Sequence, residues 1–131
     1  MSQADVETVR QVYELWNSAE GMQAALALLD PEVEYVNPES AIDAGVRRGH
    51  TGMTEVLQAL DGSFAEYLHE VERLVDAGHK VLAYVTFRAR GRDSGVLLET
   101  PEQHVWTVRD GKVVRIEWFH DEPAAKLAAG L

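Results

Sequence analysis

His104 is the residue of this sequence best suited to acid/base chemistry. An imidazole titrates near neutral pH, and burial within the segment from Val96 to Val108, which is rich in β-branched and aromatic residues, can hold it neutral. Two other polar side chains could assist it. Tyr13 could donate its hydroxyl proton to developing negative charge, and Asn37 could donate to a carbonyl or orient a water molecule. His104 is therefore the candidate proton shuttle, with Tyr13 and Asn37 as candidate polarising donors.

Each of these groups also has a structural explanation. A buried histidine is commonly bonded to a backbone carbonyl, and an asparagine before Pro38 could simply end a strand. His120 stands at the end of the last predicted strand, diagonally across from Glu102, whose carboxylate would favour the imidazolium form. His120 could therefore be an acid, an orienting group, or one half of an ion pair at the rim.

Glu102, His104 and His120 together form a two-histidine, one-carboxylate set of the type that binds non-haem iron. Alternate residues on a strand commonly share a face without binding anything, and no ligand motif reinforces this set. We therefore expect neither a metal nor another cofactor. The remaining histidines are expected in loops or at solvated polar positions, and they are His50, His69 and His79.

Three helices are predicted in the first half of the chain. Apolar residues recur every three to four positions over about residues 3–18, which predicts the first helix. A shorter helical pattern from Met22 ends at Asp30-Pro31 because proline cannot continue a helix. A third helix is expected from Thr51 to about Leu60. It follows a loop in which Arg47-Arg48 forms either a surface turn or a gate for an anionic substrate.

Strands are predicted where the period changes from helical to two. A short strand is expected over residues 33–37, before Pro38. Four longer strands, over residues 67–76, 81–90, 96–108 and 113–120, are separated by short turns, which predicts an antiparallel meander. In the second of these the odd-numbered residues, including Phe87, are expected to face inward. In the last strand the inward set is even-numbered, namely Val114, Ile116, Trp118 and His120.

The loop between the last two strands decides which residues share a face. A three-residue loop Arg109-Asp110-Gly111, with the glycine in a left-handed conformation, pairs even residues with even ones and sets His104 opposite Ile116. A two-residue Asp-Gly turn would instead set His104 beside Glu117 and turn the polar side of one strand inward. Burial therefore favours the three-residue loop.

Length and composition limit the class of protein. The chain has 131 residues, of which 46% are hydrophobic and 26% charged, and this predicts one globular domain over residues 1–131. A net charge of −10 repels nucleic acid and anionic membrane surfaces. The absence of cysteine excludes disulfides, thiolate metal sites and a cysteine nucleophile. We expect neither a signal peptide nor a membrane span, and hence a cytoplasmic protein without a nucleic-acid or membrane partner.

The order of elements and several short motifs resemble the nuclear transport factor 2-like superfamily, and within it the SnoaL-like proteins. The motifs cover nearly the whole chain and are Tyr13-Glu-Leu-Trp16, Leu29 to Pro38, Arg48-Gly49 before Thr51, and Asp110 to Trp118. The resemblance implies an α+β fold in which a curved, mostly antiparallel sheet wraps around three N-terminal helices as a cone, with a ligand pocket inside. It also implies a homodimer formed through the outer sheet face, where we expect Leu82, Tyr84, Val105, Thr107 and Phe119.

The site residues resemble two activities of this superfamily in part. Tyr13 occupies the position of the oxyanion tyrosine of steroid Δ-isomerases, but Asn37 stands where their base aspartate should be and His104 where their protonated aspartate should be. Tyr35 and Asn37 resemble the water-positioning pair of limonene-type epoxide hydrolases, yet Trp118 falls where one of their carboxylates is required. Neither mechanism is therefore carried over.

The residues and the resemblance together predict a largely aromatic pocket for a small hydrophobic molecule that bears a carbonyl or hydroxyl group. The leading function is a cofactor-free acid/base enzyme of the isomerase, cyclase or dehydratase type, in which His104 removes and returns a proton. The alternative, favoured by the missing carboxylates, is a non-catalytic ligand-binding or dimerisation module of the same fold. Taken singly, each Trp or Tyr of this set is more simply explained as part of the core. The expected substrate-binding residues are Trp16, Tyr35, Phe87, Trp106, Trp118 and His120.

Overall fold

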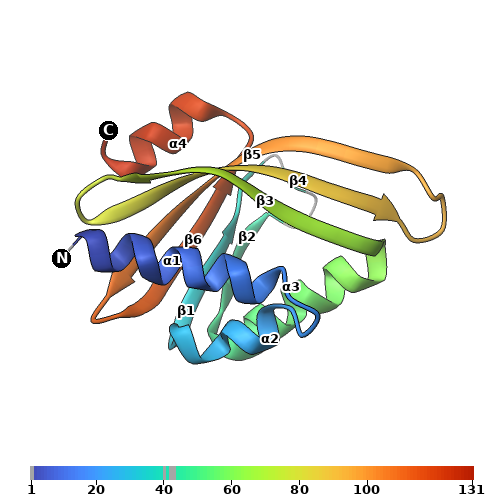
Figure 1. Ribbon diagram of the computed structural model, residues 1–131, viewed down its shortest axis with the longest axis horizontal. Coiled ribbons are helices and arrows are strands. Elements are labelled where there is room, and N and C mark those ends of the chain that lie inside the picture. Colours follow the sequence, from blue (N-terminus) through green and yellow to red (C-terminus); the bar gives the residue numbers. More distant parts are fainter. Residues whose placement is uncertain (1, 40, 42–43) are drawn as a thin grey trace.

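The computed structural model describes residues 2–39, 41 and 44–131 and shows a mixed α+β fold built on one curved, unclosed sheet (Figure 1). Its strands are β1 (Leu29–Asn37), β2 (Gly45–Arg48), β3 (Phe64–Asp76), β4 (Lys80–Gly91), β5 (Leu97–Arg109) and β6 (Lys112–Phe119). Helices α1 (Ser2–Trp16) and α3 (Gly49–Ser63) lie on one side of the sheet, and α4 (Glu122–Ala129) lies on the other. The predicted fold class is confirmed.

The two N-terminal helical segments differ in how closely they match the prediction. Helix α1 follows the predicted helix and buries its apolar stripe, with Val9 and Val12 fully covered. The second segment is shorter than predicted. It consists of α2 (Met22–Ala25) and one 3-10 turn (Leu26–Leu28), and β1 begins at once with Leu29. The cause is Pro31, because a residue before proline is pushed toward extended backbone and the helix has to end ahead of it.

The predicted loop between the first strand and the third helix contains strand β2. It pairs antiparallel with β1, so that Tyr35 faces Arg47 and Glu34 faces Arg48. Four residues are too few to show a strand period, which is why the sequence pattern missed β2. Residues 40, 42 and 43 of the predicted loop lie outside the described part of the chain. Helix α3 begins at Gly49, before the expected cap at Thr51.

The sheet has the strand order β2-β1-β6-β5-β4-β3, which makes β2 and β3 its edges. The predicted antiparallel meander of the four long strands is confirmed. The first strand joins it in parallel, with Tyr35 beside Ile116 of β6. Because β1 adjoins the last strand, residues near the start and the end of the chain line the same part of the sheet.

The hairpin between β5 and β6 corrects the predicted register. Arg109 pairs with Lys112 across a two-residue turn in which Asp110 and Gly111 have φ angles of 53° and 77°. Positive φ at both positions suits the twist of the strands, and Asp-Gly is the sequence that tolerates it. A bulge then inserts Val114, so that Val113, not Val114, is buried.

The bulge restores the pairing of even-numbered residues that burial requires. His104 faces Trp118, not Ile116 as predicted, and Trp106 faces Ile116. No polar face is therefore turned toward the core. The one extra residue of the bulge moves the residues that follow it in β6 to the opposite face of the sheet. His104 and Trp118 share the inner face, as expected.

Helix α4 was not predicted, and it covers the surface expected to form a dimer. Ala125 and Ala129 of this helix pack against Leu82 and Val105, which are both fully buried within the chain. Tyr84 donates a hydrogen bond from its hydroxyl to Glu122 Oε2 at 2.7 Å. Leu82 and Val105 are therefore unavailable to a dimer surface, because the helix covers them, whereas Tyr84, Thr107 and Phe119 are only partly buried. The homodimer itself stays a prediction.

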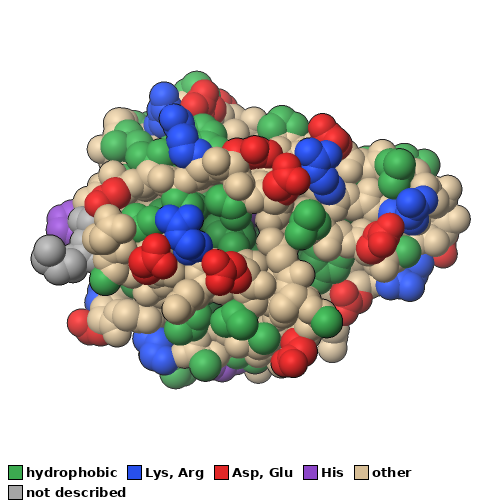
Figure 2. Space-filling view, viewed as in Figure 1, with side chains coloured by type: hydrophobic (Ala, Val, Ile, Leu, Met, Phe, Trp, Pro, Cys, Tyr) green, Lys and Arg blue, Asp and Glu red, His purple; other side chains and the backbone are tan. Residues whose placement is uncertain are grey.

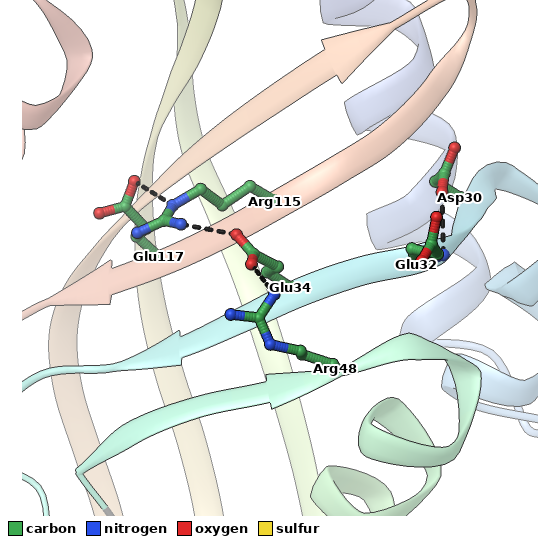
Figure 3. Close-up of polar contacts among 6 residues, drawn as sticks. All are labelled: Asp30, Glu32, Glu34, Arg48, Arg115 and Glu117. Carbon is green, nitrogen blue, oxygen red and sulfur yellow. Dashed lines mark hydrogen bonds and ion pairs between the residues drawn. The ribbon is translucent and has the colours of Figure 1, made fainter.

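A network of ion pairs joins strands β2, β1 and β6 on the face opposite Tyr35 (Figure 3). Glu34 accepts from Arg48 and, at 2.7 Å, from Arg115 Nη1. Arg115 also donates to Glu117 Oε1 at 3.1 Å. The predicted outward position of the odd-numbered residues in the last strand is confirmed for Arg115 and Glu117, and the network holds β1 in register beside β6.

The surface of the molecule carries charges of both signs side by side on the face that Figure 2 shows. Within the described ranges, no helix is long and apolar enough to cross a membrane. The core lies between the sheet and helices α1 and α3, and its largest fully buried side chains include Trp106, Tyr13 and Met53. The core thus contains Tyr13, Trp16 and Trp106 from the predicted site.

Candidate active site

A chain of three side-chain hydrogen bonds runs through the interior from Trp106 to Glu102. Trp106 Nε1 donates to the Tyr13 hydroxyl at 2.8 Å. The Tyr13 hydroxyl lies 2.6 Å from His104 Nδ1, and His104 Nε2 lies 2.9 Å from Glu102 Oε1. Strand β5 supplies three of these residues at alternate positions, so they share its inner face, and α1 supplies Tyr13.

The chemistry of the donors fixes the direction of the chain. An ionised carboxylate can only accept, so His104 Nε2 carries a proton and donates to Glu102 Oε1. In a neutral imidazole Nδ1 is then the acceptor and takes the Tyr13 hydroxyl proton, while the Tyr13 oxygen accepts from the indole N–H of Trp106. Both nitrogens of His104 are therefore engaged by side chains.

Burial increases along this chain from Glu102 inward. The side chain of Glu102 is 13% exposed, whereas that of His104 is 4% exposed. Desolvation raises the pKa of the Tyr13 hydroxyl well above 10.0, the Trp106 hydrogen bond lowers it by less, and the Glu102 charge raises it further. Tyr13 therefore stays protonated, and Glu102 is the member of the chain nearest to solvent.

Aromatic rings surround the hydrogen-bonded chain, as the sequence predicts. The Tyr13 ring lies edge-on to Trp106 with centroids 5.0 Å apart, and Trp16 stacks on Tyr13 at 6.3 Å. Phe87 lies against this group through His69, whose ring centroid is 5.0 Å from that of Phe87. Tyr13, Trp16, Trp106 and Phe87 are thus brought together, although as densely packed walls of the core.

His69 is the main addition to the predicted site. The sequence predicts a solvated residue at this position, but His69 is buried on the inner face of β3, 4.0 Å from Trp16 and 5.8 Å from His104 between ring centroids. Asn17 holds its backbone in place, because the amide accepts from His69 N–H at 2.9 Å and donates to His69 C=O at 2.7 Å. The pattern around residue 69 is mixed, and only the pairing of β3 with β4 reveals which way the ring faces.

Burial of His69 has a consequence for stability in acid. Desolvation, followed by the nearby His104, lowers the pKa of the His69 imidazole well below its usual 6.5. Below pH 6.5 the unfolded chain binds a proton at this position that the folded chain does not bind. The stability contribution is therefore complete above pH 6.5 and is lost as pH falls toward the folded-state pKa.

We expect the free energy of unfolding to fall below pH 6.5 more steeply in the wild type than in a His69→Phe variant, by about 1.4 kcal/mol per pH unit. Urea denaturation at several pH values between 6.5 and 4.5 measures this slope. The exposed His79 gives a matched control, and His79→Gln should keep the slope of the wild type. Equal slopes for the wild type and His69→Phe would contradict burial of a neutral imidazole.

Asn37 and Trp118 form a second polar pair on the inner face. Trp118 Nε1 donates to Asn37 Oδ1 at 2.6 Å, so the amide oxygen is engaged and its NH2 group is the donor end. Tyr35 lies two residues earlier on β1. Burial raises the pKa of its hydroxyl, Glu102 raises it further and Arg47 lowers it, so Tyr35 also stays protonated beside Glu102.

His120 does not join the buried group. It lies beyond the end of β6 and is exposed, with its ring edge-on to Trp118 at 5.0 Å. The predicted inward position is wrong, because the strand pairing ends at Phe119. Within the described part of the chain, no three His, Asp or Glu residues are arranged to hold a metal ion.

Two hollows open beside the aromatic group. One, of about 430 Å³, lies between α1 and β3 and is lined by Tyr13, Asn17 and His69 among others. The other, of about 330 Å³, is lined by Trp16 and Tyr67 together with residues of α3. Residues of the buried group thus border cavities large enough for a small molecule.

Comparison with known proteins identifies the family of this fold. A family model described as the SnoaL-like domain matches residues 9–116. The chain belongs to the SnoaL-like family. It is 31% identical over 127 residues to an uncharacterized protein of Mycobacterium tuberculosis (strain H37Rv), and the match covers 93% of this chain and 92% of that protein.

Solved structures share the fold of this SnoaL-like chain at low sequence identity. TerC, co-crystallized with polyporic acid, has a TM-score of 0.79 at 23% identity, covering 98% of this chain and 99% of TerC. A putative SnoaL-like polyketide cyclase from Jannaschia sp. CCS1 has a TM-score of 0.78 at 19% identity, covering 97% and 92% of the two chains. An NTF2-like protein from Burkholderia pseudomallei reaches 0.80 at 21% identity, covering 98% of both. These likenesses support the fold, and the site has to be argued from its own geometry.

Proposed function

We propose that this SnoaL-like protein is a cofactor-independent acid/base enzyme that moves a proton on a small hydrophobic carbonyl compound, with Glu102 as the base. The observation that carries the proposal is the buried chain Trp106–Tyr13–His104–Glu102, which ends on a partly exposed carboxylate. A carboxylate held by one buried hydrogen bond keeps its second oxygen for a ligand. The base is therefore assigned to Glu102, with His104 as its positioning residue.

The proposed step is removal of a proton next to a carbonyl group. The C–H bond breaks, the proton passes to Glu102, and the electron pair moves to the carbonyl oxygen as an enolate. Return of the proton to the same carbon gives exchange, and return to a different carbon gives isomerisation. General base catalysis of this kind typically contributes about 10² to 10⁴ in rate.

The Tyr35 hydroxyl is the proposed donor to the enolate oxygen. It stays protonated beside the Glu102 charge, and a protonated phenol can donate to developing negative charge. Asn37, whose amide oxygen accepts from Trp118 Nε1, lies on the same strand. Tyr13 was expected in this role, but its proton is engaged by His104, so we assign it instead to holding the imidazole.

The second candidate function is a non-catalytic ligand-binding module. It is favoured by one specific observation, namely that both nitrogens of His104 and the hydroxyl proton of Tyr13 are already bonded inside the protein. A polar network whose hydrogen bonds are all made can have a purely structural role, namely to rigidify the core. Under this alternative the pocket would bind the same class of small molecule without proton transfer.

Deuterium exchange separates the two candidates. We use 2-tetralone, a bicyclic hydrophobic ketone with acidic α-protons, in D2O, and follow loss of the α-proton signals by NMR while calorimetry measures binding. For an acid/base enzyme, the exchange rate at saturating ketone should exceed that in protein-free buffer by roughly 100-fold or more. Binding of 2-tetralone with exchange at the buffer rate would support the binding module and contradict the enzyme.

A further inference from the structure

His69 has a buried polar atom that nothing in the described part of the chain satisfies. His69 is only 4% exposed, and its Nδ1 is shielded from solvent and has no hydrogen-bond partner among the described residues. An unpaired buried polar group costs about 1–3 kcal/mol, and native structures contain few of them. Such an atom calls for a partner that the polypeptide itself does not supply.

The ring cannot reorient freely to find that partner. Two hydrogen bonds between the Asn17 side chain and the His69 backbone hold that backbone in place, one donated by Asn17 and one accepted by it. Trp16 and Phe87 enclose the His69 ring at centroid distances of 4.0 Å and 5.0 Å. His69 also borders the hollow of about 430 Å³ that lies between α1 and β3. The imidazole is therefore a fixed polar group beside a cavity, within aromatic walls.

We propose that His69 is a second ligand-binding group of the site, and that its Nδ1 forms a hydrogen bond with a hydroxyl group on a ring-shaped ligand. A neutral imidazole nitrogen either donates or accepts according to the tautomer, and a hydroxyl group can meet either requirement whereas a ketone can only accept. Trp16, Phe87 and Tyr67 pack around the His69 ring, so a ligand that reaches Nδ1 meets an aromatic environment that suits a ring-shaped molecule.

This inference deepens the proposed function, on which it rests for the ligand site, by naming the substrate class. Glu102 bonds His104 Nε2 at 2.9 Å, and the His104 ring lies 5.8 Å from the His69 ring between centroids, so one ligand can address both residues. The ligand carries a carbonyl group for Glu102 and a ring hydroxyl for His69, so it is a cyclic hydroxyketone. His69 acts in binding and orientation, and Glu102 acts on the proton. A site built to bond a hydroxyl should discriminate against the analogue that lacks it, because the imidazole is then left unpaired.

A matched pair of ketones tests the assignment. The probes are 2-tetralone and 6-hydroxy-2-tetralone, which differ only in one ring hydroxyl, and calorimetry measures both dissociation constants. The wild type should bind the hydroxylated ketone at least roughly tenfold more tightly. His69→Phe keeps an aromatic ring and should bind the two ketones within about twofold of each other. His69→Asn, whose amide lies near the position of Nδ1, should recover part of the preference.

Several outcomes would overturn the assignment. They are equal affinity of the wild type for the two ketones, no measurable binding of the hydroxylated ketone, and a full preference retained in His69→Phe. Thermal melts check folding, and His69→Leu replaces the phenylalanine variant if that variant does not fold. The measurement is of binding alone, so a hydroxyl preference without deuterium exchange would leave His69 assigned while the acid/base function fails. Deuterium exchange without a hydroxyl preference would support the acid/base function and contradict the role assigned to His69.

Discussion

The Glu102→Gln variant is expected to exchange the α-protons of 2-tetralone roughly 100-fold more slowly than the wild type, or slower still. Glutamine keeps an oxygen that can accept from His104 Nε2, so the hydrogen-bonded chain should persist. What it loses is the ability to take up a proton at neutral pH. The exchange rate should therefore fall while the dissociation constant of 2-tetralone changes by only about two- to threefold.

Glu99 provides the matched control for this prediction. It lies on the same strand, but its side chain is 65% exposed and it pairs with Arg88 on the outer face. Glu99→Gln removes one charge from β5 without touching the interior and should leave the exchange rate unchanged. Unchanged exchange in Glu102→Gln would exclude Glu102 as the base, and equal loss in both variants would indicate a general effect of charge.

The architecture could be predicted from the sequence because it depends on patterns that are local and long. Helix α1 and the four long strands each repeat their apolar period several times, and burial strongly selects one face. Strand β2 and helix α4 could not be found in this way. The first has only four residues, and the second covers a sheet face whose mixed character suggested a partner chain.

The register of the last hairpin shows how a correct conclusion can rest on an incorrect detail. A three-residue loop was expected in order to keep the inner faces matched, and the chain instead combines an Asp110-Gly111 turn with a bulge at Val114. Both solutions give the same parity at His104. Sequence patterns thus constrain which faces are buried more strongly than they constrain how the turn achieves it.

The site could be predicted only in part, because hydrogen bonds between distant elements leave no periodic signal. Tyr13 and His104 were singled out by residue type, but their separation of 91 positions hides the bond between them. Glu102 and His104 alternate on one strand, which was a usable signal for a pair. The sequence contains no signal for the burial of His69, since this burial depends on β3 lying at the edge of the sheet against α1.

The largest stability effect is expected from Tyr13→Phe. This substitution removes one oxygen and leaves two buried groups without partners, the indole N–H of Trp106 and Nδ1 of His104. Each unsatisfied group costs about 1–3 kcal/mol, so the free energy of unfolding should fall by about 2–6 kcal/mol. Urea denaturation near neutral pH measures this change.

Tyr84→Phe makes the same chemical change at the surface and serves as the control. The Tyr84 hydroxyl bonds Glu122 on the outer face, where water can replace the carboxylate, so loss of the hydroxyl should cost less than about 1 kcal/mol. A Tyr13→Phe variant as stable as Tyr84→Phe would mean that the interior hydrogen-bonded chain contributes nothing to the free energy of unfolding.

The effect of Tyr13→Phe on deuterium exchange tests the role of His104. If His104 acts by holding Glu102, the exchange rate of Tyr13→Phe should fall less than that of Glu102→Gln, because the carboxylate base is still present.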